Sequence, residues 1–190
     1  QPARPPGPVS PGLGNAPDFN YLWGLHNEGQ TYGPADAAID AREAWAFGTD
    51  CRTILVGIID TGIDYNHVDL APNIWTNPGE IAGNGIDDDG NGYVDDVHGW
   101  DFYNNDNDPY DDHSHGTHVA GTIGALGNNN RGVAGICWQA RIAALKFLSG
   151  GGSGFTSDAI EAVNYATANG IKVTNNSWGG GGFDAMLKAA

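Results

Sequence analysis

The sequence is poor in basic residues and has no long apolar run. Eight Lys and Arg stand against 23 Asp and Glu, which gives a formal net charge of −15. Binding to nucleic acid or to an anionic membrane surface requires clustered Lys and Arg, so this composition argues against both partners. No segment reaches the roughly 20 apolar residues that cross a bilayer, and residues 1–17 lack the apolar core of a signal peptide. If the protein is secreted, we expect its targeting sequence to lie outside these residues.

Cysteine is almost as scarce. Cys51 and Cys137 allow one disulfide bridge, or they are two free thiols. Their separation along the chain does not decide between these alternatives.

What the sequence does contain is an alternation of strand-like and helix-like segments. Residues 1–20 form a Pro-rich lead-in without periodicity, which we expect to be extended. Residues 54–59 are apolar on both faces, as in a parallel strand covered by helices. Further strands are predicted at 97–102, 141–148 and 171–175, and helices at 36–47, 115–126, 157–169 (with Ser157 as the N-cap) and 183–190. The alternation predicts an α/β fold, a parallel sheet flanked by helices.

Two motifs stand at the boundaries of these segments. Asp60-Thr61-Gly62 ends the strand at 54–59, and His115-Gly116-Thr117 opens the small-residue helix at 115–126. An acid at a strand end followed downstream by such a histidine resembles the subtilisin-like serine proteases. The resemblance implies that His115 is a general base and that Asp60 orients its imidazole.

That family places a nucleophilic serine after the acid and the histidine, in a Gly-Thr-Ser-Met-Ala type segment. The sequence has no such segment. We therefore expect residues 21–190 to be the N-terminal part of a subtilisin-like peptidase domain, with a sheet that is incomplete on its C-terminal side. The chain alone is then expected to be inactive, and the missing C-terminal half of the domain to be its partner.

Two further segments resemble the substrate-binding edges of the same family. Residues 175–180, Asn-Asn-Ser-Trp-Gly-Gly, resemble the segment that lines the pocket for the side chain before the cleaved bond. Residues 152–154, Gly-Ser-Gly, resemble the segment on the opposite edge. The resemblance implies that an extended polypeptide substrate lies between two edges as an added strand. The implied substrate-binding residues are Gly152, Ser153, Gly154, Ser177, Trp178 and Gly179.

The acids are concentrated in residues 87–112, which indicates divalent cations, with Ca²⁺ as the expected cofactor. The first predicted site has EF-hand-like spacing, with Gly92 at the sharp turn but neither flanking helices nor a Glu at the twelfth position. The expected calcium ligands of this first site are Asp87, Asp89, Asn91, Tyr93, Asp95 and Asp96. The alternative is that this segment is a solvated acidic loop without a bound cation.

Two more calcium sites are implied by the family resemblance. One resembles the second calcium loop of thermitase-like enzymes, with Asp101, Asn104, Asp106 and Asp108 as ligands. The other resembles the family's tight-binding calcium site, with Asp18 as the candidate for the acidic ligand near the N-terminus. Its remaining ligands are the side chains of Asp69 and Asn129 and the carbonyls of Leu126, Arg131 and Val133.

The resemblance also bears on the cysteines. In subtilisin-like folds the strands at 54–59 and 141–148 are parallel neighbours, so their N-terminal ends lie side by side. This favours a disulfide between Cys51 and Cys137, in keeping with a secreted protein.

One rival pattern points to another enzyme class. His113, His115 and His118 match the histidine spacing of metallo-β-lactamase-like zinc hydrolases. However, Thr117 stands where that motif has an acid, and the expected helix separates His113 from the other two. We expect His118 to pack internally and His113 to lie on an exposed loop.

Together these features predict a secreted, calcium-dependent serine endopeptidase that cleaves peptide bonds through an acyl-enzyme. The alternative is a calcium-stabilised fragment that binds peptides without cleaving them.

Overall fold

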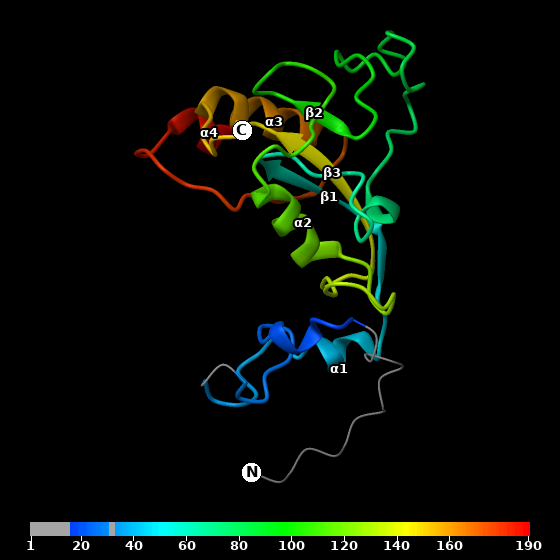
Figure 1. The fold of residues 1–190 in the computed structure, drawn as a ribbon. Coiled ribbons are helices and arrows are strands. Elements are labelled where there is room, and N and C mark those ends of the chain that lie inside the picture. Colours follow the sequence, from blue (N-terminus) through cyan, green and yellow to red (C-terminus); the bar gives the residue numbers. More distant parts are fainter. Residues whose placement is uncertain (1–15, 31–32) are drawn as a thin grey trace.

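The computed structural model describes residues 16–30 and 33–190, so most of the predicted lead-in lies outside the described residues. Its centre is a parallel sheet with strand order β2-β3-β1-β4. The strands are β1 (Asp50–Asp60), β2 (Gly99–Asp101), β3 (Gln139–Lys146) and β4 (Val173–Asn175). Helices α2 (His115–Gly124) and α3 (Thr156–Ala168) flank this sheet (Figure 1). The predicted α/β class, a parallel sheet with flanking helices, is confirmed.

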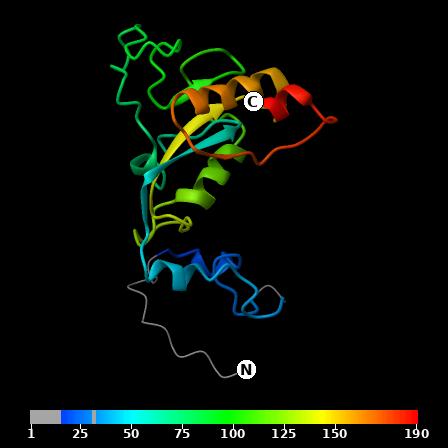
Figure 2. The ribbon, with the colours of Figure 1, turned by 180° about the vertical axis from the view of Figure 1, so that it is seen from behind.

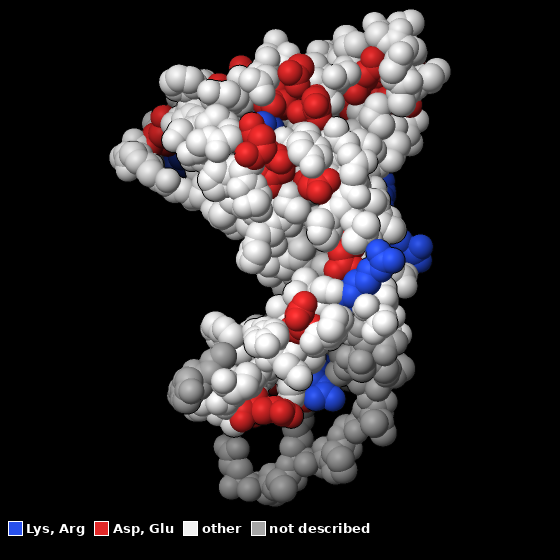
Figure 3. Space-filling model, viewed as in Figure 1, with Lys and Arg blue, Asp and Glu red and all other residues white. Residues whose placement is uncertain are grey.

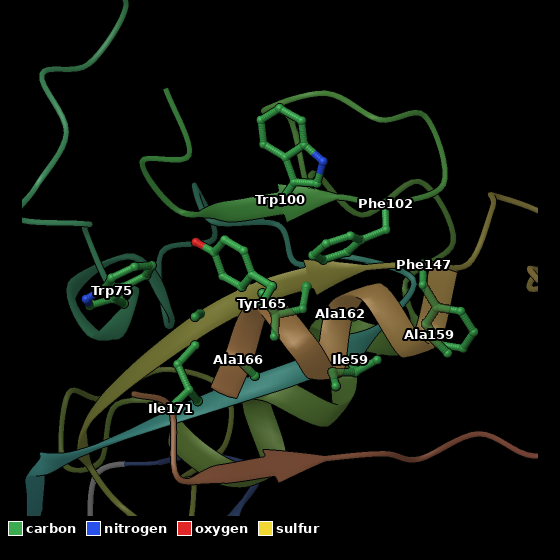
Figure 4. Close-up of a cluster of buried hydrophobic side chains, with 12 residues drawn as sticks. Ile59, Trp75, Trp100, Phe102, Phe147, Ala159, Ala162, Tyr165, Ala166 and Ile171 are labelled. Carbon is green, nitrogen blue, oxygen red and sulfur yellow. The ribbon is translucent and has the colours of Figure 1, made fainter. Parts of the chain in front are cut away.

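Residues 57–60 of β1 and residues 142–146 of β3 are buried on both faces of the sheet, to which successive side chains point alternately. Ile59 of β1 belongs to the cluster that includes α3, whereas its neighbour Ile58 belongs to the cluster that includes α2. On α3, small side chains lie toward the sheet, and the Tyr165 ring packs against the rings of Tyr93 and Phe102 (Figure 4). The small residues labelled there are Ala159, Ala162 and Ala166.

The N-terminal segment packs at the opposite end of the molecule from α3 and β2 (Figure 2). It contains the short 3-10 helix η2 (Phe19–Tyr21) and helix α1 (Ala41–Trp45). The Trp45 indole N–H donates to the Ile136 carbonyl at 2.8 Å, which ties α1 to the turn before β3. Ala16 and Phe19 are already buried, so packing begins before residue 21, where we predicted the domain to start.

Several elements are shorter than predicted. The helix expected at 36–47 is limited to α1, since Asp36 and Asp40 have φ of 68° and 56° and cannot continue a right-handed helix. Ser157 is not the N-cap of α3; the helix starts one residue earlier, and the Ser157 hydroxyl donates to Asp158. Helix α4 (Ala185–Ala189) is capped by Asp184, whose side chain accepts from two backbone N–H groups. A second 3-10 helix, η3, spans Ala71–Asn73.

Cys51 and Cys137 form a disulfide in the structure, with Cα atoms 5.9 Å apart. Asp50 of β1 is in register with Gln139 of β3, and this pairing brings the starts of the two strands together.

Acidic side chains are concentrated at the end of the molecule that carries β2 and α3, while Lys and Arg are few on this face (Figure 3). Among the residues the structure describes, no helix is long and apolar enough to cross a membrane.

Candidate active site

Asp60 and His115 come together at the C-terminal end of β1. Asp60 is fully buried, and its Oδ1 lies 2.7 Å from Nδ1 of His115, the first residue of α2. An ionised carboxylate only accepts hydrogen bonds, so Nδ1 must donate and the neutral ring keeps its acceptor at Nε2. The His115 side chain is 44% exposed, in contrast to the buried carboxylate. A buried acid thus fixes the tautomer of an accessible histidine.

The glycines of the two motifs allow this approach. Gly62 has a φ of +103°, and a Cβ there would lie 2.6 Å from the Pro109 carbonyl oxygen. A Cβ on Gly116 would lie 2.1 Å from the carbonyl oxygen of Gly62. Since real Cβ contacts below 3.0 Å are essentially not found, only glycine lets the start of α2 rest on the end of β1.

Asp111 organises the start of α2, a role that the sequence did not indicate. Ser114, which precedes the helix, makes no side-chain capping hydrogen bond. Asp111 instead accepts from the backbone N–H groups of His113, Ser114 and Thr117 and from the Thr117 hydroxyl. Burial alone would raise the pKa of Asp111, but these hydrogen bonds outweigh it and hold the pKa below its usual value.

Lys146 is a second buried charge at this edge of the sheet. It is 2% exposed and stands in register with Asp60 on the neighbouring strand. Its ammonium group donates to the carbonyl of Thr61 at 2.6 Å, the carboxylate of Asp112 at 2.7 Å and the carbonyl of Leu148 at 2.8 Å. These three bonds use all the ammonium hydrogens. A single lysine at the end of a strand gave no signal of this role in the sequence.

The rival zinc arrangement does not form among the described residues. His115 Nδ1 faces Asp60, and the ligand nitrogens of the three histidines do not converge as a group in the described residues. His113 is exposed, as expected. His118 is exposed too, so the prediction that it packs internally is wrong; it lines a cavity of about 650 Å³ between residues 21–25 and α2.

The two segments predicted to bind substrate follow the strands on either side of β1. Residues 152–154 lie in the turn after β3, where the Ser149 N–H donates to the Ser153 carbonyl at 2.9 Å. Ser177, Trp178 and Gly179 follow β4; the Trp178 ring packs on Phe147 with centroids 4.8 Å apart. Because β1 pairs with both β3 and β4, the two segments flank the strand that ends at Asp60.

Comparison with known proteins identifies the family of this chain. The sequence pattern of the Subtilase family matches residues 52–190. The chain belongs to the subtilase family.

The relatives of this subtilase include subtilisin-like protease 1 of Plasmodium berghei, 38% identical over 160 residues, which are 84% of this chain and 25% of that protein. Thermitase of Thermoactinomyces vulgaris is 36% identical over 78% of this chain and 44% of its own length. The crystal structure of a cold-adapted subtilisin-like serine proteinase covers 92% of this chain and 50% of that chain, with 27% identity and a TM-score of 0.53. The chain therefore spans less than half the length of these curated relatives.

The acidic loop, residues 80–96, brings three carboxylates close together. Ligand atoms of Glu80, Asp87 and Asp89 all lie within 4.8 Å of one another. Glu80 was not among the predicted ligands, because it precedes the EF-hand-like pattern. Asp95 accepts instead from the backbone of residues 83–85, and buried Asp96 accepts from the Tyr165 hydroxyl and from the side chains of Asn77 and Asn91. The pKa of Asp96 is raised by its burial.

Asn91 and Tyr93 lie next to these carboxylates. The Asn91 side-chain amide donates to Asp89 and Asp96, and its oxygen accepts from the Tyr93 N–H. Hard oxygen donors at this density suit Ca²⁺.

The second predicted loop closes on itself through Asp101, whose buried carboxylate accepts from the backbone and side chain of Asn104. Asp106 pairs with Asp101 through the backbone and accepts from the Asp108 N–H, while Asp108 accepts from the Tyr65 hydroxyl. The loop thus presents several carboxylate oxygens in a short span, a donor set that also suits Ca²⁺.

At the third site, the Asn129 amide contacts the Asp69 carboxylate and the Leu126 N–H donates to the Asp69 carbonyl at 3.0 Å. The Asn129 oxygen accepts from the Arg131 N–H. Asp18 reaches the same loop, since its N–H donates to the Gly132 carbonyl at 3.1 Å, next to Val133.

Proposed function

We propose that this chain supplies the acid and base of a serine endopeptidase that hydrolyses peptide bonds through an acyl-enzyme. The observation that carries the proposal is the 2.7 Å contact between buried Asp60 and exposed His115. In such a pair, Nε2 takes the proton of a nucleophile and later gives it to the leaving amine. In the described part of the chain no serine hydroxyl hydrogen-bonds the His115 ring. The subtilase resemblance, in which the serine follows the acid and the histidine along the chain, supports a nucleophile supplied by another part of the parent protein.

We further propose that the substrate is an extended polypeptide held between residues 152–154 and residues 177–179. Support comes from their position on both sides of β1 and from the family to which the chain belongs. Main-chain pairing with two edges binds many sequences with little selection, which suits a general endopeptidase.

Calcium and secretion are part of the same proposal. The carboxylates of Glu80, Asp87 and Asp89 would hold one cation, and the loops around Asp101 and Asp69 would hold two more. Such ions stabilise the folded state, since they bind it and not the unfolded chain. The Cys51–Cys137 disulfide supports an oxidising, extracellular location.

The test is reaction of the full-length gene product with a fluorophosphonate, followed by intact mass measurement. We expect a single adduct on a serine, lost in His115→Gln and retained in the matched control His113→Gln, which changes the neighbouring exposed histidine. Absence of an adduct on folded wild-type protein would overturn the proposal. Binding of peptides by that unreactive protein would establish the non-catalytic alternative.

A further inference from the structure

Thr61 is held by four hydrogen bonds, although the residue itself has no part in the proposed proton transfers of Asp60 and His115. Its N–H donates to Asp60 Oδ1 at 2.7 Å, and its carbonyl accepts from Lys146 at 2.6 Å. Its hydroxyl donates to Asp111 at 2.9 Å and accepts from the Gly116 N–H at 2.9 Å. The residue is 1% exposed, so none of these groups has water as a ready substitute.

Besides Asp60, Thr61 has two charged partners, Lys146 and Asp111, which bear opposite signs and make separate contacts. Lys146 is paired with Asp112, whereas Asp111 is surrounded by hydroxyl and backbone donors. A buried charge is stable only where its hydrogen-bonding capacity is filled, so each group is confined to its present position. Thr61 lies between them and is fixed through both its backbone and its side chain.

The hydroxyl is the only one of these groups that joins the strand to the helix. Through Asp111 it is linked to the first turn of α2, and through Gly116 it is linked to the residue after His115. The backbone of the same residue is continuous with Asp60. The Asp60–His115 contact, the close approach of Gly116 to Gly62 and the Asp64 N–H bond to the Thr117 hydroxyl also join the two elements. Within Thr61, the side-chain oxygen is the group through which the residue after the acid is tied to the residue after the base.

We propose that Thr61 is a positioning residue whose hydroxyl sets the separation of Asp60 and His115. The role rests on the proposed function, because it concerns the efficiency of that acid–base pair. Loss of the hydroxyl leaves both catalytic side chains in place but frees the start of α2 to shift. A displacement of about 1 Å in a catalytic group costs on the order of a hundredfold in rate.

The experiment compares Thr61→Val with Thr61→Ser in the full-length enzyme. Valine keeps the shape and removes the oxygen, whereas serine keeps the oxygen. We expect kcat per phosphonate-titrated site to fall about a hundredfold in T61V, with KM within about twofold, and T61S to stay within about threefold of wild type. Thr122→Val is the matched control in α2, because its hydroxyl contacts only the His118 carbonyl one turn earlier.

Several outcomes would overturn the role of Thr61. One is a folded T61V enzyme with wild-type kcat, and another is a T61S enzyme as impaired as T61V. If T61V does not fold, Thr61→Ala decides, since it also removes the hydroxyl but places no methyl group among these polar partners; a kcat within threefold of wild type would then reject the proposal. A wild-type enzyme that fails to react with the phosphonate would instead reject the proposed function, and the role of Thr61 with it.

Discussion

Substitution of Gly116 by alanine tests whether the close approach of β1 and α2 controls catalysis. The new Cβ would lie 2.1 Å from the Gly62 carbonyl oxygen, and contacts below 3.0 Å are essentially not found. The start of α2 must therefore move by about 0.9 Å, the difference between these two distances. Because His115 is the adjacent residue, a shift of this size is expected to lower kcat/KM by about a hundredfold.

The same change also tests the packing of the site. Overpacking of a close contact costs about 1–3 kcal/mol, which corresponds to a fall in melting temperature of roughly 2–12 °C for a domain of about 150–250 residues, and to a smaller fall in a longer full-length protein. The matched control is Gly48→Ala, where a Cβ meets nothing within 4 Å and φ is not positive; it should leave kcat/KM unchanged. Peptide hydrolysis and thermal melting of the full-length protein provide the two readouts. A folded G116A enzyme within threefold of wild-type kcat/KM would refute the reasoning.

Three further predictions concern stability, measured on phosphonate-inhibited protein to prevent autolysis. Chelation of Ca²⁺ should lower the melting temperature, since an ion at 1,000 times its dissociation constant adds about 4 kcal/mol; melting that ignores the chelator would count against all three sites. Replacement of Cys51 and Cys137 by alanine should lower the unfolding free energy by up to about 4.6 kcal/mol, from the chain entropy of an 86-residue separation, and an unchanged urea midpoint would contradict this. Asp111, whose pKa is lowered in the folded state, adds stability above about pH 4 that is lost as the pH falls through the lowered pKa. Asp111→Asn should therefore be less stable at neutral pH and lose less stability on acidification; an acid loss equal to that of wild type would show that another group is responsible.

The proposed acid and base could be singled out in the sequence because each stands in a motif at an element boundary, and their roles were implied by the resemblance to subtilisin-like proteases. Asp60 follows a doubly apolar strand, and His115 opens a helix of small residues. The contacts of Lys146 and Asp111 with Thr61 could not be predicted, since they span 85 and 50 residues and only the folded chain brings these groups together. The bonds from Asp111 to the start of α2 are local, and we did not predict them. A lysine at the end of a strand and an acid in a loop have no periodicity that indicates these long-range contacts.

The ligands of the acidic loop were also only partly predictable from the sequence. The alternating spacing of residues 87–96 identifies a cluster of oxygen donors but not which of them converge. Asp95 and Asp96 are drawn away by backbone N–H groups and by Tyr165, and Glu80 takes a place beside Asp87 and Asp89. A carboxylate forms whichever hydrogen bonds its position in the fold permits, so a ligand set cannot be read from spacing alone.

The carboxylate of Asp60 is unevenly bonded, and this bears on how the pair works. Oδ1 accepts from both the Thr61 N–H and the His115 ring, whereas Oδ2 is buried with no partner among the described residues. A buried anion with an unfilled acceptor is costly to fold. When His115 gains a proton, its positive charge develops 2.7 Å from this under-compensated anion, in surroundings where attraction is stronger than in water. The arrangement that destabilises the resting carboxylate therefore stabilises the imidazolium, provided that the start of α2 is held against the end of β1.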